Sequence, residues 1–283
     1  MTAILDRSVA APQRHVVRHA PRQRPNPLVQ WWVLTRRLLA PTLRNGEILT
    51  SLLAPAVFTV GFYIPLDTVM TIFGPGLSSY AQFLMPMIVL QALAFAAISS
   101  AFRAATDAVE GINRRFGAMP MPSAVPFAAR MSANMIRCSI SLAAAVVCGY
   151  LIGFRFFGPP AHTVGFIAFA LAIGLGLCLF GDVLGTWSRN PEATTQALML
   201  PQLILGMLSV GFAPADQFPE WVQGFVRNQP ISQFTYGLRA LAGDSTAAAG
   251  AVTWSVMAVP LAWVVGLIVV FAPLAVYMTS RRP

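Results

Sequence analysis

Six apolar stretches, separated by short polar segments, run through the chain from residue 48 onward. An α-helix needs ~20 residues to cross ~30 Å of hydrocarbon, and each stretch is about that long. The pattern therefore predicts an all-α, polytopic membrane protein with six transmembrane helices. The predicted spans are 48–66, 80–101, 131–153, 163–187, 196–213 and 252–277.

The region ahead of the first span divides into two parts. Residues 1–27 are polar, rich in arginine and interrupted by prolines, which predicts a disordered cytosolic tail that is not a secretory signal. Residues 28–46 carry apolar and basic positions at helical spacing, and we predict a helix along the membrane surface. A plain extension of the first span is the alternative. The interfacial residues are Trp31, Trp32, Arg36 and Arg37, and residues 28–283 form one transmembrane domain.

A long segment of low charge, 214–250, precedes the last predicted span. Two apolar stripes at helical spacing flank a break at Pro230, and they predict a helical hairpin that re-enters the outer leaflet, with Arg227 and Arg239 reaching the headgroups. An ordinary extracellular loop on the bilayer is the alternative. We predict that this hairpin gates the exit of the transport pathway, through Trp221, Phe225, Pro230, Phe234 and Leu238.

Composition supports a membrane protein and orients it. The chain is 56% hydrophobic and 10% charged, against about 25% charged residues in soluble domains. All nineteen basic residues are arginines, and fifteen of them fall in the N-terminal region and the segments predicted on the same side. Positive charge collects on the cytoplasmic side, so we predict a bacterial plasma-membrane protein with both termini in the cytoplasm. This distribution disfavours a nucleic-acid-binding protein.

The longest segment predicted on the inner side, 102–130, carries a short charged helix. Glu110 and Arg114 lie four residues apart, which favours a helical ion pair, and Pro120 ends the helix. Such a helix is a candidate docking element for a cytosolic partner. A solvated loop that only sets the topology is an equally good interpretation. The candidate coupling residues are Asp107, Glu110, Gly111, Arg114, Arg115 and Phe116.

Candidate chemistry within the spans is sparse. Arg137 and Asp182 lie at similar predicted depths, so we hypothesise that they form an intramembrane ion pair. The role of that pair is either functional or structural. The three cysteines are scattered without a CxxC motif, and the three histidines do not cluster, so we predict no metal site. The chain contains no GxxxxGK[ST] phosphate-binding loop. We therefore expect no catalytic residues and no cofactor bound by this chain.

Four segments resemble the type-2 ABC exporter permeases of the daunorubicin-resistance family. They are LRNGE at 43–47, FRAATD at 102–107, NRRF followed by MPM within 113–121, and VRNQPISQ at 226–233. Within that family the chain is most similar to the B subunits of the mycobacterial group linked to phthiocerol dimycocerosate export. The resemblance covers about residues 28–283.

The resemblance implies a permease that has no ATPase of its own. Such a subunit pairs with a second permease, either a sister C-type chain or a second copy, and with two cytosolic ATPase chains that bind ATP and Mg. The inner helix around Glu110 acts as the coupling helix. The cargo is a hydrophobic or amphiphilic molecule, either a long-chain cell-envelope lipid such as phthiocerol dimycocerosate or a daunorubicin-like drug.

Two other classes of protein remain as alternatives. An ion-coupled secondary multidrug transporter needs several intramembrane carboxylates or broken helices, and only Asp182 qualifies. A membrane-embedded lipid-modifying enzyme needs a cluster of His, Asp, Glu or Ser at one membrane surface, and the sequence shows none.

Overall fold

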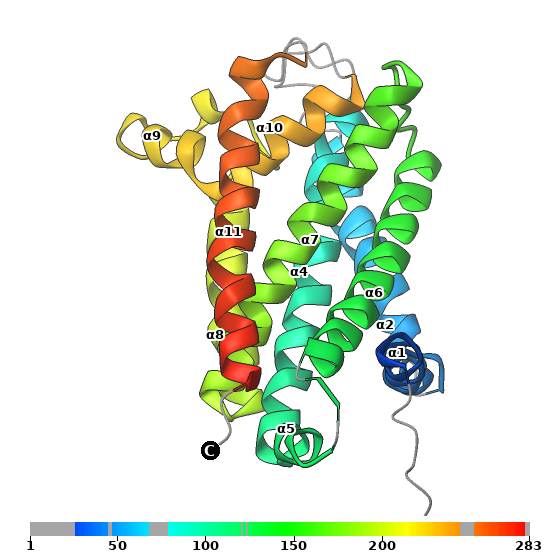
Figure 1. The fold of residues 1–283 in the computed structure, drawn as a ribbon. Helices are drawn as coiled ribbons and strands as arrows, with labels where there is room; N and C mark the ends of the chain where they lie inside the picture. Colours follow the sequence, from blue (N-terminus) through cyan, green and yellow to red (C-terminus); the bar gives the residue numbers. More distant parts are fainter. Residues whose placement is uncertain are drawn as a thin grey trace, which may run out of the picture.

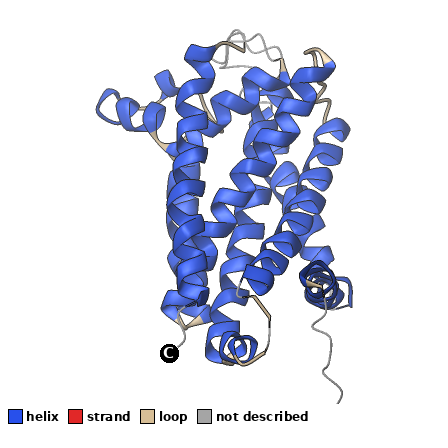
Figure 2. Cartoon of the chain, in the orientation of Figure 1, coloured by secondary structure: helices blue, strands red, loops and turns tan. Residues whose placement is uncertain are grey.

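The computed structural model describes residues 26–44, 47–67, 79–119, 121–122, 124–243 and 252–280. Nearly all of the predicted tail, 1–27, lies outside these residues. The described part is all-α and contains no strand, which confirms the predicted fold class (Figure 2).

Four helices in the described part are long and apolar enough to cross a membrane. They are α4 (Tyr80–Val109), α6 (Ala124–Leu151), α7 (Pro160–Ser188) and α11 (Trp254–Ser280). At ~1.5 Å per residue, each is longer than the ~30 Å hydrocarbon layer. Each contains most of one predicted span, and α4 and α6 also continue into the segment that was predicted as a loop.

The remaining two predicted spans are shorter or interrupted. The first consists of α2 (Glu47–Phe58) followed by one turn of π-helix, η1 (Thr59–Tyr63), and Pro55 lies inside α2. The fifth is α8 (Pro191–Met207), which is 17 residues long and contains Pro201. The count of six spans therefore stays a prediction.

The connection between α7 and α8 shows how the sequence sets a sharp reversal. Arg189 ends α7 in the left-handed conformation, with a φ of 51°. Asn190 caps α8 because its side chain accepts a hydrogen bond from the backbone N–H of Ala193 at 3.0 Å. Pro191 then occupies the first turn, where its missing N–H costs no hydrogen bond. The chain consequently reverses direction between the two helices.

Helix α4 is the centre of the bundle, and its first half is buried almost completely. Its closest neighbour is α7, where Gly181 and Gly185 face α4. A Cβ at Gly181 would lie 2.9 Å from the carbonyl oxygen of Ala97, and one at Gly185 would strike the backbone at Ala101. Two glycines four residues apart allow this close approach of two helices in a membrane.

Short helices lie across the two ends of the bundle (Figure 1). Helices α1 (Pro27–Arg44) and α5 (Ile112–Gly117) lie at one end, together with the C-terminal end of α11. Helices α9 (Glu220–Asn228) and α10 (Pro230–Ala242) lie at the other end, after the 3-10 turn η2 (Ala215–Gln217).

The two outer helices differ from the predicted hairpin in what they bury. On α9, Trp221 and Phe225 are exposed, as expected for a face towards lipid. On α10, however, Phe234 and Leu238 are buried in the main core. The second stripe therefore packs against protein and not against the bilayer, because α10 inserts between α4, α7 and α11.

Arg239 also corrects a prediction, because it does not reach the headgroups. Its side chain is 1% exposed. It donates to the carbonyl oxygens of Phe83 and Val210, each at 2.8 Å, and its guanidinium lies over the Phe83 ring. These bonds join α10 to the N-terminal end of α4.

Candidate functional site

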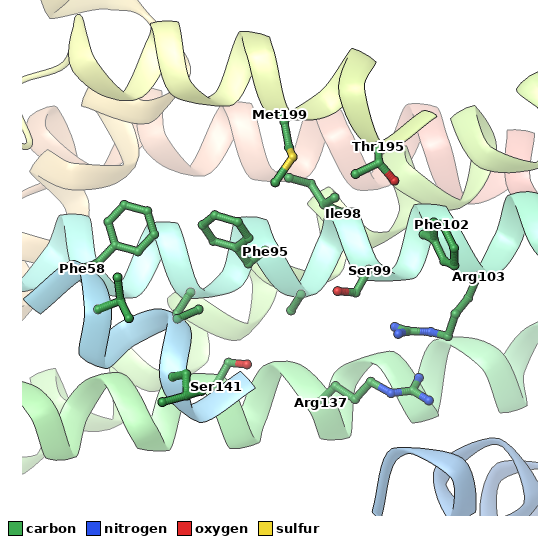
Figure 3. Close-up of a pocket in the computed structure, with 15 residues that line it drawn as sticks. Phe58, Phe95, Ile98, Ser99, Phe102, Arg103, Arg137, Ser141, Thr195 and Met199 are labelled. Atoms are coloured by element: carbon green, nitrogen blue, oxygen red, sulfur yellow. The ribbon is translucent and has the colours of Figure 1, made fainter. Parts of the chain in front are cut away.

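A cavity of about 610 Å³ opens between α2, α4, α6 and α8 (Figure 3). Part of its wall is apolar and aromatic, from Phe58, Phe95 and Met199. Arg103 and Arg137 line it further along, towards the end where α1 and α5 lie. The cavity therefore offers apolar surface together with a charged end.

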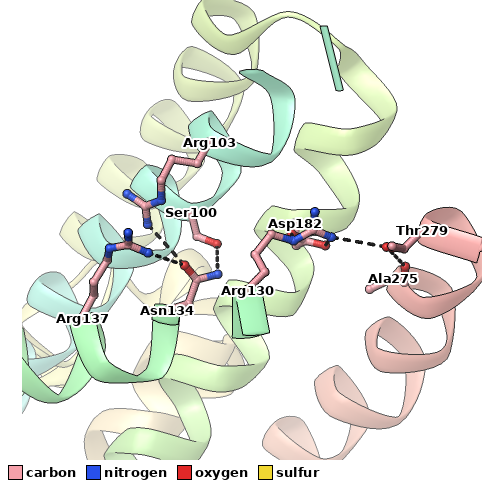
Figure 4. Close-up of polar contacts among 8 residues, drawn as sticks. All are labelled: Ser100, Arg103, Arg130, Asn134, Arg137, Asp182, Ala275 and Thr279. Atoms are coloured by element: carbon pink, nitrogen blue, oxygen red, sulfur yellow. Dashed lines mark hydrogen bonds and ion pairs between the residues drawn. The ribbon is translucent and has the colours of Figure 1, made fainter. Parts of the chain in front are cut away.

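The two arginines of the cavity meet at one amide (Figure 4). Arg103 on α4 and Arg137 on α6 donate to Oδ1 of Asn134, at 3.4 Å and 3.2 Å. Asn134 in turn donates to Oγ of Ser100 at 2.6 Å, which fixes the orientation of its amide. Helices α4 and α6 are thus joined by a buried polar network at the charged end of the cavity.

Arg137 also holds the transverse helix α1. It donates to the carbonyl oxygen of Leu38 at 2.8 Å and to Oγ1 of Thr42 at 2.7 Å. Further along α1, Nε1 of Trp31 donates to Oγ of Ser132 at 3.1 Å. The predicted interfacial residues Trp32, Arg36 and Arg37 are exposed. Helix α1 is therefore anchored to α6 while one of its faces stays open.

Asp182 has a different partner from the one predicted. Its carboxylate pairs with Arg130, at 2.8 Å to Nε and 3.0 Å to Nη2, and Arg130 also donates to Thr279 of α11 (Figure 4). The predicted partner, Arg137, instead joins the network around Asn134. The prediction failed because α6 begins at Ala124 and not near residue 131, so Arg130 lies within the helix. Arg130 and Arg137 lie seven residues apart, and residues seven apart on a helix share a face. The spacing in the sequence could therefore also have indicated Arg130 as the partner of Asp182.

The candidate coupling residues gather at the end of α4 and on α5. Gly111, with a φ of 67°, makes the turn between the two helices, in a conformation that glycine adopts at no steric cost. Glu110, Arg114 and Arg115 are exposed. Asp107, Gly111 and Phe116 are partly buried. The structure thus brings the six residues together at one end of the bundle, and their coupling role remains a prediction.

A second cavity, of about 410 Å³, lies between α4, α7, α8, α10 and α11. Its lining is almost entirely apolar and includes Trp263 and Phe271 of α11. Its polar side chains, Gln91 and Gln202, are hydrogen-bonded to each other at 2.6 Å. Sequence reasoning missed this cavity, because isolated glutamines in apolar stretches give no pattern that links them.

Comparison with known proteins identifies the family of the chain. The ABC-2 family transporter protein family matches residues 45–277. The chain is 48% identical over 259 residues to the doxorubicin resistance ABC transporter permease protein DrrB of Mycobacterium tuberculosis, with 90% of each chain covered.

Two more distant relatives carry related descriptions. The daunorubicin resistance ABC transporter permease protein DrrB1 of Streptomyces coeruleorubidus is 26% identical over 210 residues, which cover 74% of this chain and 72% of that protein. The probable doxorubicin resistance ABC transporter permease protein DrrC of M. tuberculosis is 25% identical over 251 residues, 88% of each chain. The chain is therefore a multi-pass membrane protein that belongs to the ABC-2 transporter family and, within it, to the daunorubicin-resistance permeases.

Proposed function

We propose that the chain is the membrane-spanning subunit of an ATP-driven exporter that moves a hydrophobic or amphiphilic molecule out of the cytoplasmic leaflet. Membership of the permease family supports transport, and the two cavities, of about 610 and 410 Å³, have the apolar lining that such a cargo needs. Both a long-chain lipid, such as phthiocerol dimycocerosate, and a planar drug suit these linings. The relatives' names favour a drug of the doxorubicin or daunorubicin type.

We propose that the chain works with partners that supply the energy. A permease that lacks a phosphate-binding loop needs a cytosolic ATPase, in two copies, whose subunits bind ATP and Mg. Relatives named DrrB and DrrC occur in the same M. tuberculosis strain, which supports a heterodimer with a C-type permease. A second copy of this chain is the other arrangement.

The observation that carries the proposal is the junction of α4 with α5. Helix α4 runs through the centre of the bundle, lines both cavities, and is joined to α5 through the left-handed Gly111. Helix α5 then lies across the end of the bundle with Arg114 and Arg115 exposed (Figure 1). A push on α5 by a bound partner would act directly on the helix that lines the transport pathway.

The test is to change α5 and measure hydrolysis and transport separately. Glu110→Ala and Arg115→Ala should leave membrane insertion intact and uncouple ATP hydrolysis from export in the reconstituted complex. The matched control is Arg155→Ala, an exposed arginine in the connection between α6 and α7, which should change neither. Normal export by the combined Glu110→Ala/Arg115→Ala variant would contradict the coupling role of α5.

We also propose that the exposed side chains of α9, Trp221 and Phe225, lie at the exit of the pathway in the outer leaflet. Their exposure in an otherwise short amphipathic helix supports contact with lipid. An ion-coupled secondary transporter is less well supported, because the carboxylate of Asp182 is paired with Arg130 and lines neither of the two cavities. With α9 in the outer leaflet, helix α1 at the opposite end of the bundle would lie along the inner surface of the membrane.

A further inference from the structure

The smaller cavity, between α4, α7, α8, α10 and α11, has a lining without charge. No Arg, Lys, His, Asp or Glu occurs among the described residues that line it. Its wall includes Trp263 and the rings of Phe180 and Phe271, which meet edge to face with their centroids 5.1 Å apart. Moving a charged group from water into such surroundings is costly, because no opposite charge is there to pair with it. The cavity therefore suits an uncharged molecule.

One polar side chain in the wall of this cavity has an unused hydrogen-bonding atom. Gln202 of α8 donates from Nε2 to Oε1 of Gln91 on α4, at 2.6 Å. The other atom of its amide, Oε1, is buried and accepts no hydrogen bond from any residue that the structure describes. A buried acceptor without a partner is unfavourable, since it has given up its bond to water. A ligand that donates a hydrogen bond to this oxygen would remove that penalty.

The packing of α8 on α4 keeps the two amides at the cavity. Gly206 follows Gln202 by one turn of α8, and a Cβ there would lie 2.9 Å from Nε2 of Gln91. Because glycine has no side chain, Gln91 has room to reach α8. The last torsion of a glutamine side chain has a broad range, so a small turn of the Gln202 amide brings Oε1 to a group inside the cavity.

We infer that this cavity binds a neutral, apolar molecule that carries a hydroxyl group, and that the hydroxyl donates a hydrogen bond to Oε1 of Gln202. The volume of about 410 Å³ falls in the range of about 300–1,000 Å³ typical of small-molecule sites. Pro230 of α10 also lines the cavity, which therefore extends towards the end of the bundle where α9 and α10 lie. The same chemistry describes a cargo of the exporter and a resident neutral lipid with a free hydroxyl.

The experiment compares two probes that differ in one group. 1-Hydroxypyrene has a hydroxyl where 1-methylpyrene has a methyl group of similar size. The purified full chain is placed in phosphatidylcholine nanodiscs, and the binding of each probe in excess of empty nanodiscs is measured by fluorescence. One net hydrogen bond corresponds to about two- to tenfold in affinity, so the wild-type chain should prefer 1-hydroxypyrene by about that factor. The charged probe 1-pyrenesulfonate should show no excess binding.

Two variants test the site by different means. Gln91→Leu/Gln202→Leu removes both amides together, so neither is left without its partner, and it should abolish the preference for the hydroxyl. Ala197→Phe keeps both amides and fills space where the exposed Ala197 lines the cavity, so it should weaken the binding of both probes. The matched control is Gln196→Leu, which replaces an exposed glutamine of α8 that lines neither cavity and should change nothing.

Several results would overturn the inference. They are equal affinity of the wild-type chain for 1-hydroxypyrene and 1-methylpyrene, an unchanged preference in the folded double variant, and excess binding of 1-pyrenesulfonate that equals that of 1-hydroxypyrene. Thermal unfolding of each variant in one detergent shows whether it is folded. If the double variant is unstable, Ala197→Phe decides, and unchanged binding of both probes by that variant would place them outside this cavity.

The role of the bound molecule as cargo rests on the proposed function, and a transport assay separates the two. ATP-driven export of 1-hydroxypyrene that falls in the double variant supports the site as part of the pathway. Glutamine-dependent binding without export of 1-hydroxypyrene, by a complex that exports other amphiphiles, supports a resident neutral lipid in the same site. Export together with no preference for the hydroxyl contradicts the site but leaves the exporter standing, and binding with no export of any amphiphile contradicts the exporter alone.

Discussion

Among individual residues, Arg130 and Asp182 form an ion pair that ties together three helices of the bundle. They join α6 to α7, and the bond from Arg130 to Thr279 adds α11. Asp182 is 1% exposed and Arg130 is 9% exposed, so water solvates neither charge well. The electrostatic attraction between the two charges offsets part of that loss of solvation.

The first prediction removes one charge of this pair. Asp182→Asn or Arg130→Gln should destabilise the protein by about 3–5 kcal/mol, because each removes one half of a buried ion pair that joins two helices. The measurement is thermal unfolding of the purified chain in one detergent. The double variant Arg130→Met/Asp182→Leu should recover most of the loss, since it leaves no charge behind. A double variant as unstable as the single ones would show that the charge account is wrong.

The second prediction concerns the close contact between α4 and α7. Gly185→Ala should destabilise the protein by about 1–3 kcal/mol, because the new methyl group meets the rigid backbone at Ala101 and forces the helices apart. Gly266→Ala is the matched control, since a Cβ there meets no atom within 4 Å. A lower melting temperature is expected for the first variant only. Equal melting temperatures for both would mean that α7 tolerates a wider spacing from α4.

Among the elements, α9 and α10 have opposite roles although both have apolar stripes. The apolar residues of α10 belong to the protein core, whereas α9 exposes Trp221 and Phe225. The same substitution should therefore have different effects on the two helices.

The third prediction compares Phe225→Asp with Leu238→Asp. Leu238 is fully buried, so a carboxylate there should prevent stable folding. Phe225→Asp should leave the melting temperature near that of the wild type and impair export, because it weakens the contact of α9 with lipid. A cysteine at position 225 should resist a membrane-impermeant thiol reagent in intact cells, while one at the exposed Asn228 should react. Rapid labelling at both positions would show that α9 lies in water.

At the scale of the whole molecule, the two ends of the bundle are chemically different. Helices α1 and α5 and the last turn of α11 share one end, and α9 and α10 share the other (Figure 1). The fifteen arginines that set the predicted orientation fall in the N-terminal region and in the segments predicted on the inner side.

The fourth prediction follows from that asymmetry. With positive charge retained in the cytoplasm, a reporter enzyme that is active only outside the cytoplasm should be silent when fused after Pro283. A fusion within 244–250, next to α10, should be active. Activity at the C-terminal fusion would invert the topology, and with it the proposed docking of an ATPase on α5.

The sequence by itself determined the helical class and the positions of the long helices. Lipid cannot hydrogen-bond to a backbone, so an apolar stretch of some 20 residues has to satisfy its N–H and C=O groups internally as a helix. Proline, glycine and asparagine also set local boundaries, as Asn190 and Pro191 do at the start of α8. These features depend on neighbours along the chain and can be read without knowing the fold.

Only the tertiary structure decided which faces meet. A stripe such as that of Phe234 and Leu238 is the same in the sequence whether it faces lipid or protein, because both surroundings are apolar. The partner of Asp182 depended on where α6 begins, and the two cavities depend on the spacing of four or five helices distant in the chain. The candidate coupling region could be proposed from the sequence because its charges are local, whereas the meeting of Arg103 and Arg137 at Asn134 required the packing of α4 on α6.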